Sequence, residues 1–332
     1  TRSKRDWSSD VCSSDLYFRE NIVIDGAERD CWRKGKPESN QKPLPGTKAS
    51  FFHDYYFTSG LEATIMMLEY VNTTNDRDFL KKTVVPFARE VLLFFQLHYG
   101  KDESGKLLLD PGMALETWWL VKNPAPDISF LLPCLAKLIV MDAGSAKDQK
   151  IWKDFLTTIP EIPTRIIDGK KAIASGETWE HKHNCENPET YAIFPFNNYG
   201  VVWGTEDIVQ TTMENRVSVN KYHYGCWTQD QIMWAHAGNA EEASYGLDKR
   251  FRRAEKVVRF PIFGRVGPDE CPDFDHFGSG SIALQHMLVQ EGNSKIVLLP
   301  AWPEEWDVDF KLHLSKGAII TGTVKNGKLE NW

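Results

Sequence analysis

The chain has 332 residues, of which 42% are hydrophobic, 26% charged and 12% aromatic. This composition excludes a disordered, collagen-like or low-complexity protein, and the length suits one large domain or two ordinary ones. The formal net charge of -7 leaves no electrostatic footprint for nucleic acid or an anionic membrane. No stretch reaches about 18 consecutive apolar residues, so no membrane-spanning helix is expected.

The N-terminal segment has an unusual origin. Asp6–Leu16 reads DWSSDVCSSDL, which matches the codon-by-codon translation of a short-read sequencing adapter. We therefore expect residues 1–16 to be a non-native artefact and the natural chain to start near Tyr17, with earlier segments missing. Residues 17–50 are rich in Lys, Pro and Gly, which predicts a linker or loop.

The remaining cysteines, once Cys12 is set aside, lack a short regular spacing. They are Cys31, Cys134, Cys185, Cys226 and Cys271. An odd number at irregular spacing predicts neither a disulfide framework nor a CxxC metal site. No metal and no cofactor is expected.

Helical periodicity begins at Thr58. Apolar residues recur there every three or four positions, which predicts a helix as far as about Val71. The same pattern predicts helices over 76–95, 127–141, 147–158, 206–216, 228–237, 240–253 and 279–290. Several are joined by only a few residues, which is typical of antiparallel helical hairpins. Pro86 is predicted either to kink the second helix or to start its main part.

The period changes to that of strands after Gln290. Strands are predicted over 295–299, 309–314 and 318–324, and Asn326-Gly327 is typical of a two-residue hairpin turn. The predicted fold is mainly α: an incomplete (α/α)6 toroid of helical hairpins over 51–291, with its first hairpins missing. A small C-terminal β-sheet unit is predicted over 292–332.

Glu116 is the first candidate for chemistry. It lies between apolar neighbours and beside Trp118 and Trp119 in a predicted loop. Surroundings of low polarity favour the protonated form of a carboxyl group, which is what a general acid needs near neutral pH. The alternative is a surface glutamate at the start of a helix.

A second candidate cluster precedes the last predicted helix. It contains Asp273, Asp275 and His276. Alternatively, these carboxylates stabilise that helix by interacting favourably with the positive end of its dipole. Two carboxylates from different loops that face one cleft would be the minimum equipment for glycoside hydrolysis.

Aromatic and histidine side chains are concentrated in or near the predicted loops. The tryptophans are Trp118, Trp119, Trp179, Trp203 and Trp227. Their flat apolar faces and single N–H suit the face of a sugar ring, although ordinary packing of hairpin ends is the alternative. We expect His181 and His183 to bind substrate rather than zinc, because the second half of a ligand set is not visible.

Seven short segments in order resemble motifs of one enzyme family. They are 74–80 (TGDxxFL), 111–116 (PSxSPE), Asp127 (near the acidic residue of TMD), 181–183 (HRH), 225–228 (GWS), Asp275 (IDGNFG) and 298–301 (LLPA). From about Ser50 to its end the chain thus resembles the catalytic part of glycoside hydrolase family 95. These are six-hairpin (α/α)6 glycosidases that include inverting α-L-fucosidases, and the chain is more similar to their uncharacterised relatives.

The resemblance implies a mechanism. Glu116 would protonate the glycosidic oxygen while Asp275 helps to activate a water on the opposite face. The activity implied is exo-acting, inverting removal of a terminal, fucose-like sugar from a glycan or plant polysaccharide. The implied substrate-binding residues are Trp118, Trp119, His181, His183, Trp227 and His276. The implied partner is an oligosaccharide or polysaccharide, and family habit favours a periplasmic or secreted location.

Two other interpretations stay open. A polysaccharide lyase of the (α/α) barrel type would use a Tyr or His to abstract a proton next to a uronate. Its basic substrate groove could come from Lys182, Lys221 and His223. A non-catalytic relative would keep an aromatic cleft for carbohydrate without turning it over.

Overall fold

The computed structural model describes residues 55–216, 225, 227–252 and 274–332. The predictions for residues 1–50, and for Lys221, His223 and Asp273, lie outside these ranges. None of the helices within the ranges combines the length and hydropathy that crossing a bilayer requires. The chain divides into two compact units, which are described separately. Unit 1 comprises Thr1–Glu69, Arg77–Glu161 and Ser175–Glu186, and unit 2 comprises Tyr70–Asp76, Ile162–Ala174 and Asn187–Trp332.

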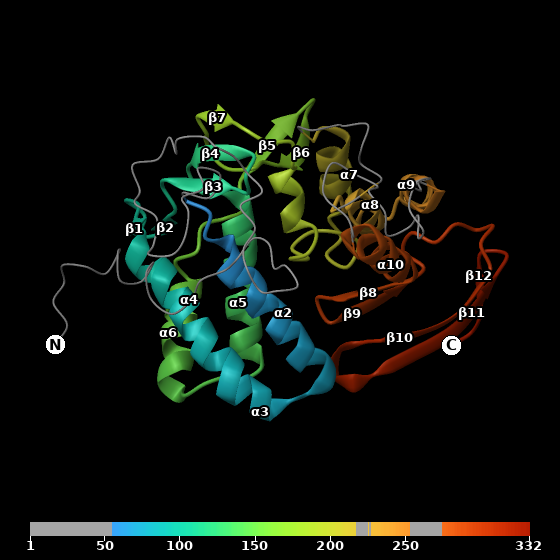
Figure 1. Cartoon of the computed structure of the whole chain (residues 1–332), viewed down its shortest axis with the longest axis horizontal. Helices are drawn as coiled ribbons and strands as arrows, with labels where there is room; N and C mark the ends of the chain where they lie inside the picture. The colour runs from blue at the N-terminus through green and yellow to red at the C-terminus, as the bar shows by residue number, and fades with distance from the viewer. Residues whose placement is uncertain (1–54, 217–224, 226, 253–273) are drawn as a thin grey trace, which may run out of the picture. The chain divides into compact units, whose positions relative to one another are not determined.

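Helices form most of unit 1 (Figure 1). They are α2 (Thr58–Thr74, whose last turn belongs to unit 2), α3 (Arg77–Phe79), a π-helix (Leu80–Val84), α4 (Val85–His98), α5 (Ala125–Val140) and α6 (Ala146–Leu156). Pro86 is the second residue of α4 and follows the π-helix closely, so the helical run is continuous on both sides of it. Pro86 therefore does not start a separate helix, and the helix adopts π-helical geometry directly before α4.

Buried apolar side chains and a few polar contacts hold these helices together. The core of α5 includes Ile128, Leu131, Leu135 and Leu138, all fully buried at three- or four-residue spacing. Across the α4–α6 contact, the Arg89 guanidinium donates to both carboxylate oxygens of Asp148. The helices predicted from periodicity in this part of the chain are confirmed.

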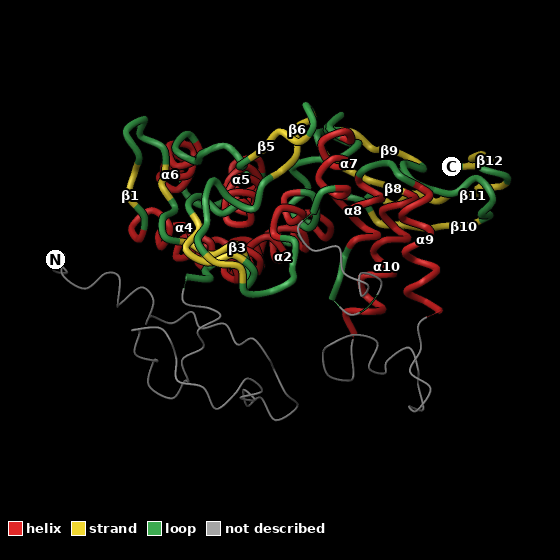
Figure 2. The backbone as a smooth tube through the Cα atoms, turned by 90° about the horizontal axis from the view of Figure 1, so that it is seen from above, coloured by secondary structure: helices red, strands yellow, loops and turns green. Residues whose placement is uncertain are grey.

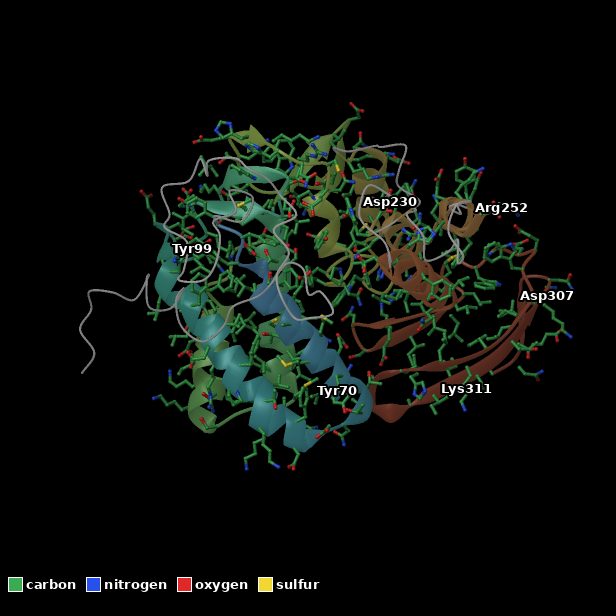
Figure 3. All side chains as sticks on the ribbon, in the orientation of Figure 1. Tyr70, Tyr99, Asp230, Arg252, Asp307 and Lys311 are labelled. Carbon is green, nitrogen blue, oxygen red and sulfur yellow. The ribbon has the colours of Figure 1, made fainter. Side chains whose placement is uncertain are left out.

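Unit 1 also contains strands that the periodicity did not predict. They are β1 (Gly100–Lys101), β2 (Leu107–Leu108), β3 (Gly112–Ala114), β4 (Trp118–Val121) and β7 (His181–Lys182). β4 is the central strand of the antiparallel sheet β3-β4-β7, in which Trp118 pairs with Lys182 and Trp119 with His181. The hydroxyl of Tyr99, labelled at the end of α4 in Figure 3, donates to the carbonyl oxygen of Pro111 at 3.4 Å. This contact joins the end of α4 to the segment that enters β3.

Unit 2 combines helices with small antiparallel sheets (Figure 2). Its helices are α7 (Glu206–Glu214), α8 (Asp230–His236), α9 (Ala240–Arg252) and α10 (Phe274–Leu288), with 3-10 turns at Pro188–Ala192 and Ser315–Gly317. Its strands are β5 (Thr164–Ile167), β6 (Lys170–Ile173), β8 (Val289–Gly292), β9 (Lys295–Leu298), β10 (Val308–His313), β11 (Ile319–Lys325) and β12 (Lys328–Asn331). Helices α8, α9 and α10 pack against one another.

The C-terminal strands follow the prediction. β10, β11 and β12 form one sheet in chain order, and Asn326 and Gly327 both have positive φ in the turn between β11 and β12. Phe310 and Val324 are buried in a cluster with Leu288 and Val289. The alternating pattern of the sequence therefore identified these strands because one sheet face is buried.

Helix α10 starts earlier than predicted, at Phe274 rather than at Ser279. The glycines at 278 and 280 suggested a break, because glycine weakens a helix interior. In the structure Gly280 packs closely on α9, where an added Cβ would lie 2.7 Å from the Phe251 ring. Tertiary packing thus stabilises a helical turn that local propensity disfavours. Asp275 and His276 consequently lie within the first turn of α10 and not in a loop before it.

Candidate active site

Glu116 lies at the tip of the hairpin that joins β3 to β4. Leu115, Glu116 and Thr117 form the turn. Leu115 is fully buried and adopts a left-handed conformation with φ 49. Leu115 stands where the PSxSPE motif has its second proline. A proline cannot adopt a positive φ, so this turn has a different backbone conformation from one that contains the proline. Glu116 itself is half-buried at the end of a small sheet.

Residues that follow β7 contact this turn directly. The side-chain amide of Asn184 donates to Oε2 of Glu116 at 2.8 Å. The backbone N–H of Glu116 donates to Oε2 of Glu186 at 2.9 Å, and the Thr117 hydroxyl lies 3.2 Å from the same oxygen. The backbone N–H of His183 also donates to the Thr117 carbonyl at 2.8 Å. Both the side chain and the main chain of Glu116 are therefore positioned by one segment.

One face of the β3-β4-β7 sheet carries Trp119 and two histidines. The indole N–H of Trp119 donates to the carbonyl oxygen of Glu116 at 3.1 Å. Its ring stacks on His183 with a centroid distance of 3.6 Å and an interplanar angle of 19°. His181 lies on the same face, 6.1 Å from the His183 ring. Exposed His181 and His183 and half-buried Trp119 thus form a continuous aromatic surface beside the Glu116 turn.

Trp118 belongs to the opposite face of the same sheet, because successive strand residues alternate. Its ring packs against Trp179 at 4.8 Å, and the Lys182 ammonium lies 5.7 Å from its centroid. Only 8% of Trp118 is exposed, and its indole N–H has no hydrogen-bond partner among the described residues. The predicted substrate-binding residues of unit 1 are therefore brought together by one sheet but divided between its two faces.

Three predicted site residues lie in unit 2. Asp275 is exposed in the first turn of α10. His276 is fully buried, and its ring Nε2 lies 3.0 Å from the carbonyl oxygen of Arg250. Trp227 is half-buried in the turn before α8. The ring of His276 is thus committed to a contact within the core of unit 2.

Asp127 is a buried carboxyl group in unit 1. It lies in the first turn of α5 and accepts a hydrogen bond of 2.9 Å from the Thr58 hydroxyl at the start of α2. Its second oxygen, Oδ2, is buried and has no hydrogen-bond partner within the described part of the chain. Burial raises the pKa of Asp127 to about 7, with the Thr58 hydrogen bond acting in the opposite direction.

The sequence reasoning missed the residues that hold Glu116. Asn184 and Glu186 stand in a polar segment directly after the HKH run. Their closeness in sequence to these predicted substrate-binding histidines was the one sequence feature that could have pointed to them. Within the described ranges no group of three or more His, Cys, Asp or Glu could hold a metal ion.

Of three comparisons with known proteins, one found a similar fold. No protein-family model matches the chain, and no curated protein matches it. The resemblance to family 95 therefore remains an expectation. Among solved structures, one described as "Putative kojibiose phosphorylase from human microbiome" is similar, with a TM-score of 0.51 and 10% sequence identity. The match covers 80% of this chain and 44% of that one, so the chain spans less than half of its length. The chain therefore shares the fold of part of that structure.

Proposed function

We propose that this chain contributes the general acid of an enzyme that cleaves glycosidic bonds. The observation that carries the proposal is the Glu116 carboxyl group, which accepts the Asn184 amide and stands on a turn whose main chain is contacted by Trp119, itself stacked on His183. A general acid must be held within hydrogen-bond reach of the leaving oxygen, and an aromatic face suits a sugar ring. The fold shared with a carbohydrate-active enzyme supports the same reaction class.

The role of Asp275 is a further part of the proposal. Asp275 is exposed at the start of α10, where a carboxylate is favoured by the helix dipole. It would help to activate a water that attacks the anomeric carbon while Glu116 protonates the leaving oxygen. An inverting enzyme requires this division of labour between two carboxyl groups. In its most specific form, the proposal is that the enzyme removes a terminal, fucose-like sugar and that its helical hairpins belong to an (α/α)6 toroid.

Phosphorolysis is the second candidate reaction. The similar solved structure is named as a phosphorylase, and phosphate would then replace water as the nucleophile. On one face of the sheet, exposed His181 and His183 offer ring N–H donors that suit a phosphate group, whereas Lys182 pairs with Trp118 on the opposite face. Hydrolase and phosphorylase are distinguished by their dependence on inorganic phosphate.

The experiment compares the wild-type chain with Glu116→Gln on a panel of 4-nitrophenyl glycosides and disaccharides, with and without inorganic phosphate. Loss of the acid is expected to lower kcat by about 10²- to 10⁴-fold on the disaccharides. A matched control is Glu103→Gln, an exposed glutamate in the β1–β2 turn. Equal rates for wild type and Glu116→Gln would exclude Glu116 as the acid.

The remaining interpretations give different results in the same assay. A lyase would form an unsaturated uronate from a uronic-acid polymer, whereas a glycosidase would form a reducing sugar. A carbohydrate-binding relative would bind a disaccharide equally well as wild type and as Glu116→Gln, with no product from either. An inverting hydrolase would release the anomer opposite to that of its substrate, which NMR detects before mutarotation.

A further inference from the structure

Asn184 is held in one orientation by its own neighbour. Its side-chain oxygen Oδ1 accepts the backbone N–H of Cys185 at 2.8 Å. The oxygen and nitrogen of an amide are assigned from such contacts. Because Oδ1 is used in this way, the NH2 group must point toward Oε2 of Glu116, where it lies at 2.8 Å.

The partner oxygen on Glu116 then has a defined role. An amide N–H can only donate, so Oε2 of Glu116 acts as an acceptor in this contact. In a protonated carboxyl group, the carbonyl oxygen is the better acceptor and the other oxygen carries the proton. The contact therefore favours the acid proton on Oε1.

The main chain of the turn is fixed by the same segment. Oε2 of Glu186 accepts the backbone N–H of Glu116 at 2.9 Å, and the Thr117 hydroxyl lies 3.2 Å from both Oε2 and the carbonyl oxygen of Glu186. Because β7 pairs with β4, the segment 184–186 and the turn 115–117 emerge from adjacent strands of one sheet. The turn that carries Glu116 is therefore held by contacts that do not depend on the orientation of the Glu116 side chain.

We infer that Asn184 is a positioning residue that directs the acid proton of Glu116 to Oε1, and that Glu186 anchors the turn on which Glu116 stands. This inference rests on the proposed function, in which Glu116 is the general acid. Asn184 touches Glu116 and needs no contact with the substrate. Its effect should therefore appear only where the reaction depends on proton donation.

The test measures how the rate depends on the leaving group. Substrates are 2,4-dinitrophenyl and 4-methoxyphenyl glycosides of a sugar that the wild-type chain cleaves. The first leaving group departs without protonation and the second requires it. For Asn184→Ala we expect kcat to fall by about tenfold or more on the 4-methoxyphenyl glycoside and by less than about threefold on the dinitrophenyl glycoside.

A structural role alone would lower both rates equally, and that result would overturn the inference. Asn184→Gln, which keeps an amide donor, should recover part of the rate on the 4-methoxyphenyl glycoside. The matched control is Asn215→Ala. Asn215 is exposed at the end of α7 in unit 2, and its amide donates to the carbonyl oxygen of Thr211. This control should show wild-type rates on both substrates.

A second measurement separates this inference from the proposed function. The shift in Tm caused by Asn184→Ala is compared in the wild-type background and in Glu116→Ala. If the contact is formed, the shift is smaller in Glu116→Ala by about 2 °C. Equal shifts in the two backgrounds would refute the contact even if the chain cleaves glycosides. Unequal shifts in a chain that cleaves no glycoside would instead refute the proposed function and leave the contact standing.

Discussion

The side chains of Arg250 and His276 each contact the main-chain carbonyl oxygen of the other residue. Nη1 of the Arg250 guanidinium donates to the carbonyl oxygen of His276 at 2.7 Å, and the ring Nε2 of His276 lies 3.0 Å from the carbonyl oxygen of Arg250. Both side chains are fully buried. The guanidinium also donates to Oε1 of Gln231 at 3.2 Å and to the hydroxyl of Thr228 at 3.1 Å. Arg250 thereby joins α9 to α8, to the segment before it, and to the first turn of α10, where Asp275 stands.

The ring of His276 should contribute measurably to stability. A carbonyl oxygen only accepts, so Nε2 carries the proton, and His276→Phe leaves the Arg250 carbonyl without this donor. We expect a loss of about 1 to 3 kcal/mol in the free energy of unfolding, measured by urea denaturation. The control is His181→Phe on exposed β7, which should change that free energy by no more than about 0.5 kcal/mol. Similar small effects of both substitutions would contradict the prediction.

A histidine pair in unit 2 should make the fold sensitive to acid. Nε2 of His236 lies 3.0 Å from Nδ1 of His286, so one ring must accept and is neutral. Removal from water lowers the pKa of both rings, that of His286 to about 4, and the charge of His286 further lowers that of His236. Both values lie below 6.5, the ordinary value. The stability from the neutral pair is therefore complete above pH 6.5 and is lost as the pH falls from there toward 4.

The measurement is the free energy of unfolding of wild type and His286→Gln at several pH values between about 7 and 4. The profile of the variant should be flatter, because one of the two groups no longer titrates. Parallel profiles would show that the pair does not control acid stability.

Asp127 should produce the opposite dependence on pH. Burial raises its pKa from the ordinary value of 3.8 to about 7, so the folded state favours the protonated form. Its contribution is fully present below the unfolded pKa of about 3.9 and is lost as the pH rises through 7. Asp127→Asn is neutral at every pH and keeps an oxygen for the Thr58 hydroxyl. Thermal unfolding should show the variant gaining stability relative to wild type as the pH rises from about 4 to about 7, whereas a constant difference over that range would refute the raised pKa.

The contact between α4 and α6 should be sensitive to acid for a different reason. Oδ1 of Asp148 accepts from Nε of Arg89 at 2.8 Å, and Oδ2 accepts from the Ser145 backbone N–H at 2.6 Å. The Arg89 hydrogen bonds, followed by those of Ser145, hold the pKa of Asp148 well below its usual range. A lowered carboxyl pKa gives stability that is present above the unfolded value and lost as the pH falls through the folded value.

Asp148→Asn should therefore cost about 1 kcal/mol at neutral pH, because Arg89 is partly exposed and the pair is screened by water. Denaturant unfolding at pH 7 and near pH 2 tests this, and the difference between variant and wild type should shrink at the lower pH. A cost that is the same at both values would mean that the charge of Asp148 is not involved.

The hydrophobic periodicity of the sequence was sufficient to predict most of the helices and the C-terminal strands. Leu61, Ile65 and Leu68 are buried on one face of a single helix. Their three- and four-residue spacing is visible within a few turns of sequence, so the helix could be predicted from local pattern alone. The strands around Phe310 and Val324 were predictable for the same reason, since alternation and an Asn-Gly turn are local signals. Predicting Glu116 as a candidate needed only its apolar neighbours and adjacent tryptophans.

The arrangement around Glu116 depended on pairing between distant segments. Asn184 lies 68 residues from Glu116 in sequence, and the two meet because β7 adds to β4 in one particular register. A shift of one residue would exchange the faces on which Trp118 and Trp119 lie. The burial of His276 likewise depends on Arg250, 26 residues away on another helix. The sequence alone determined which residue types stand near the candidate acid. Only tertiary structure decided which of them touch it, because strand register and interhelical packing are set by contacts that no local pattern contains.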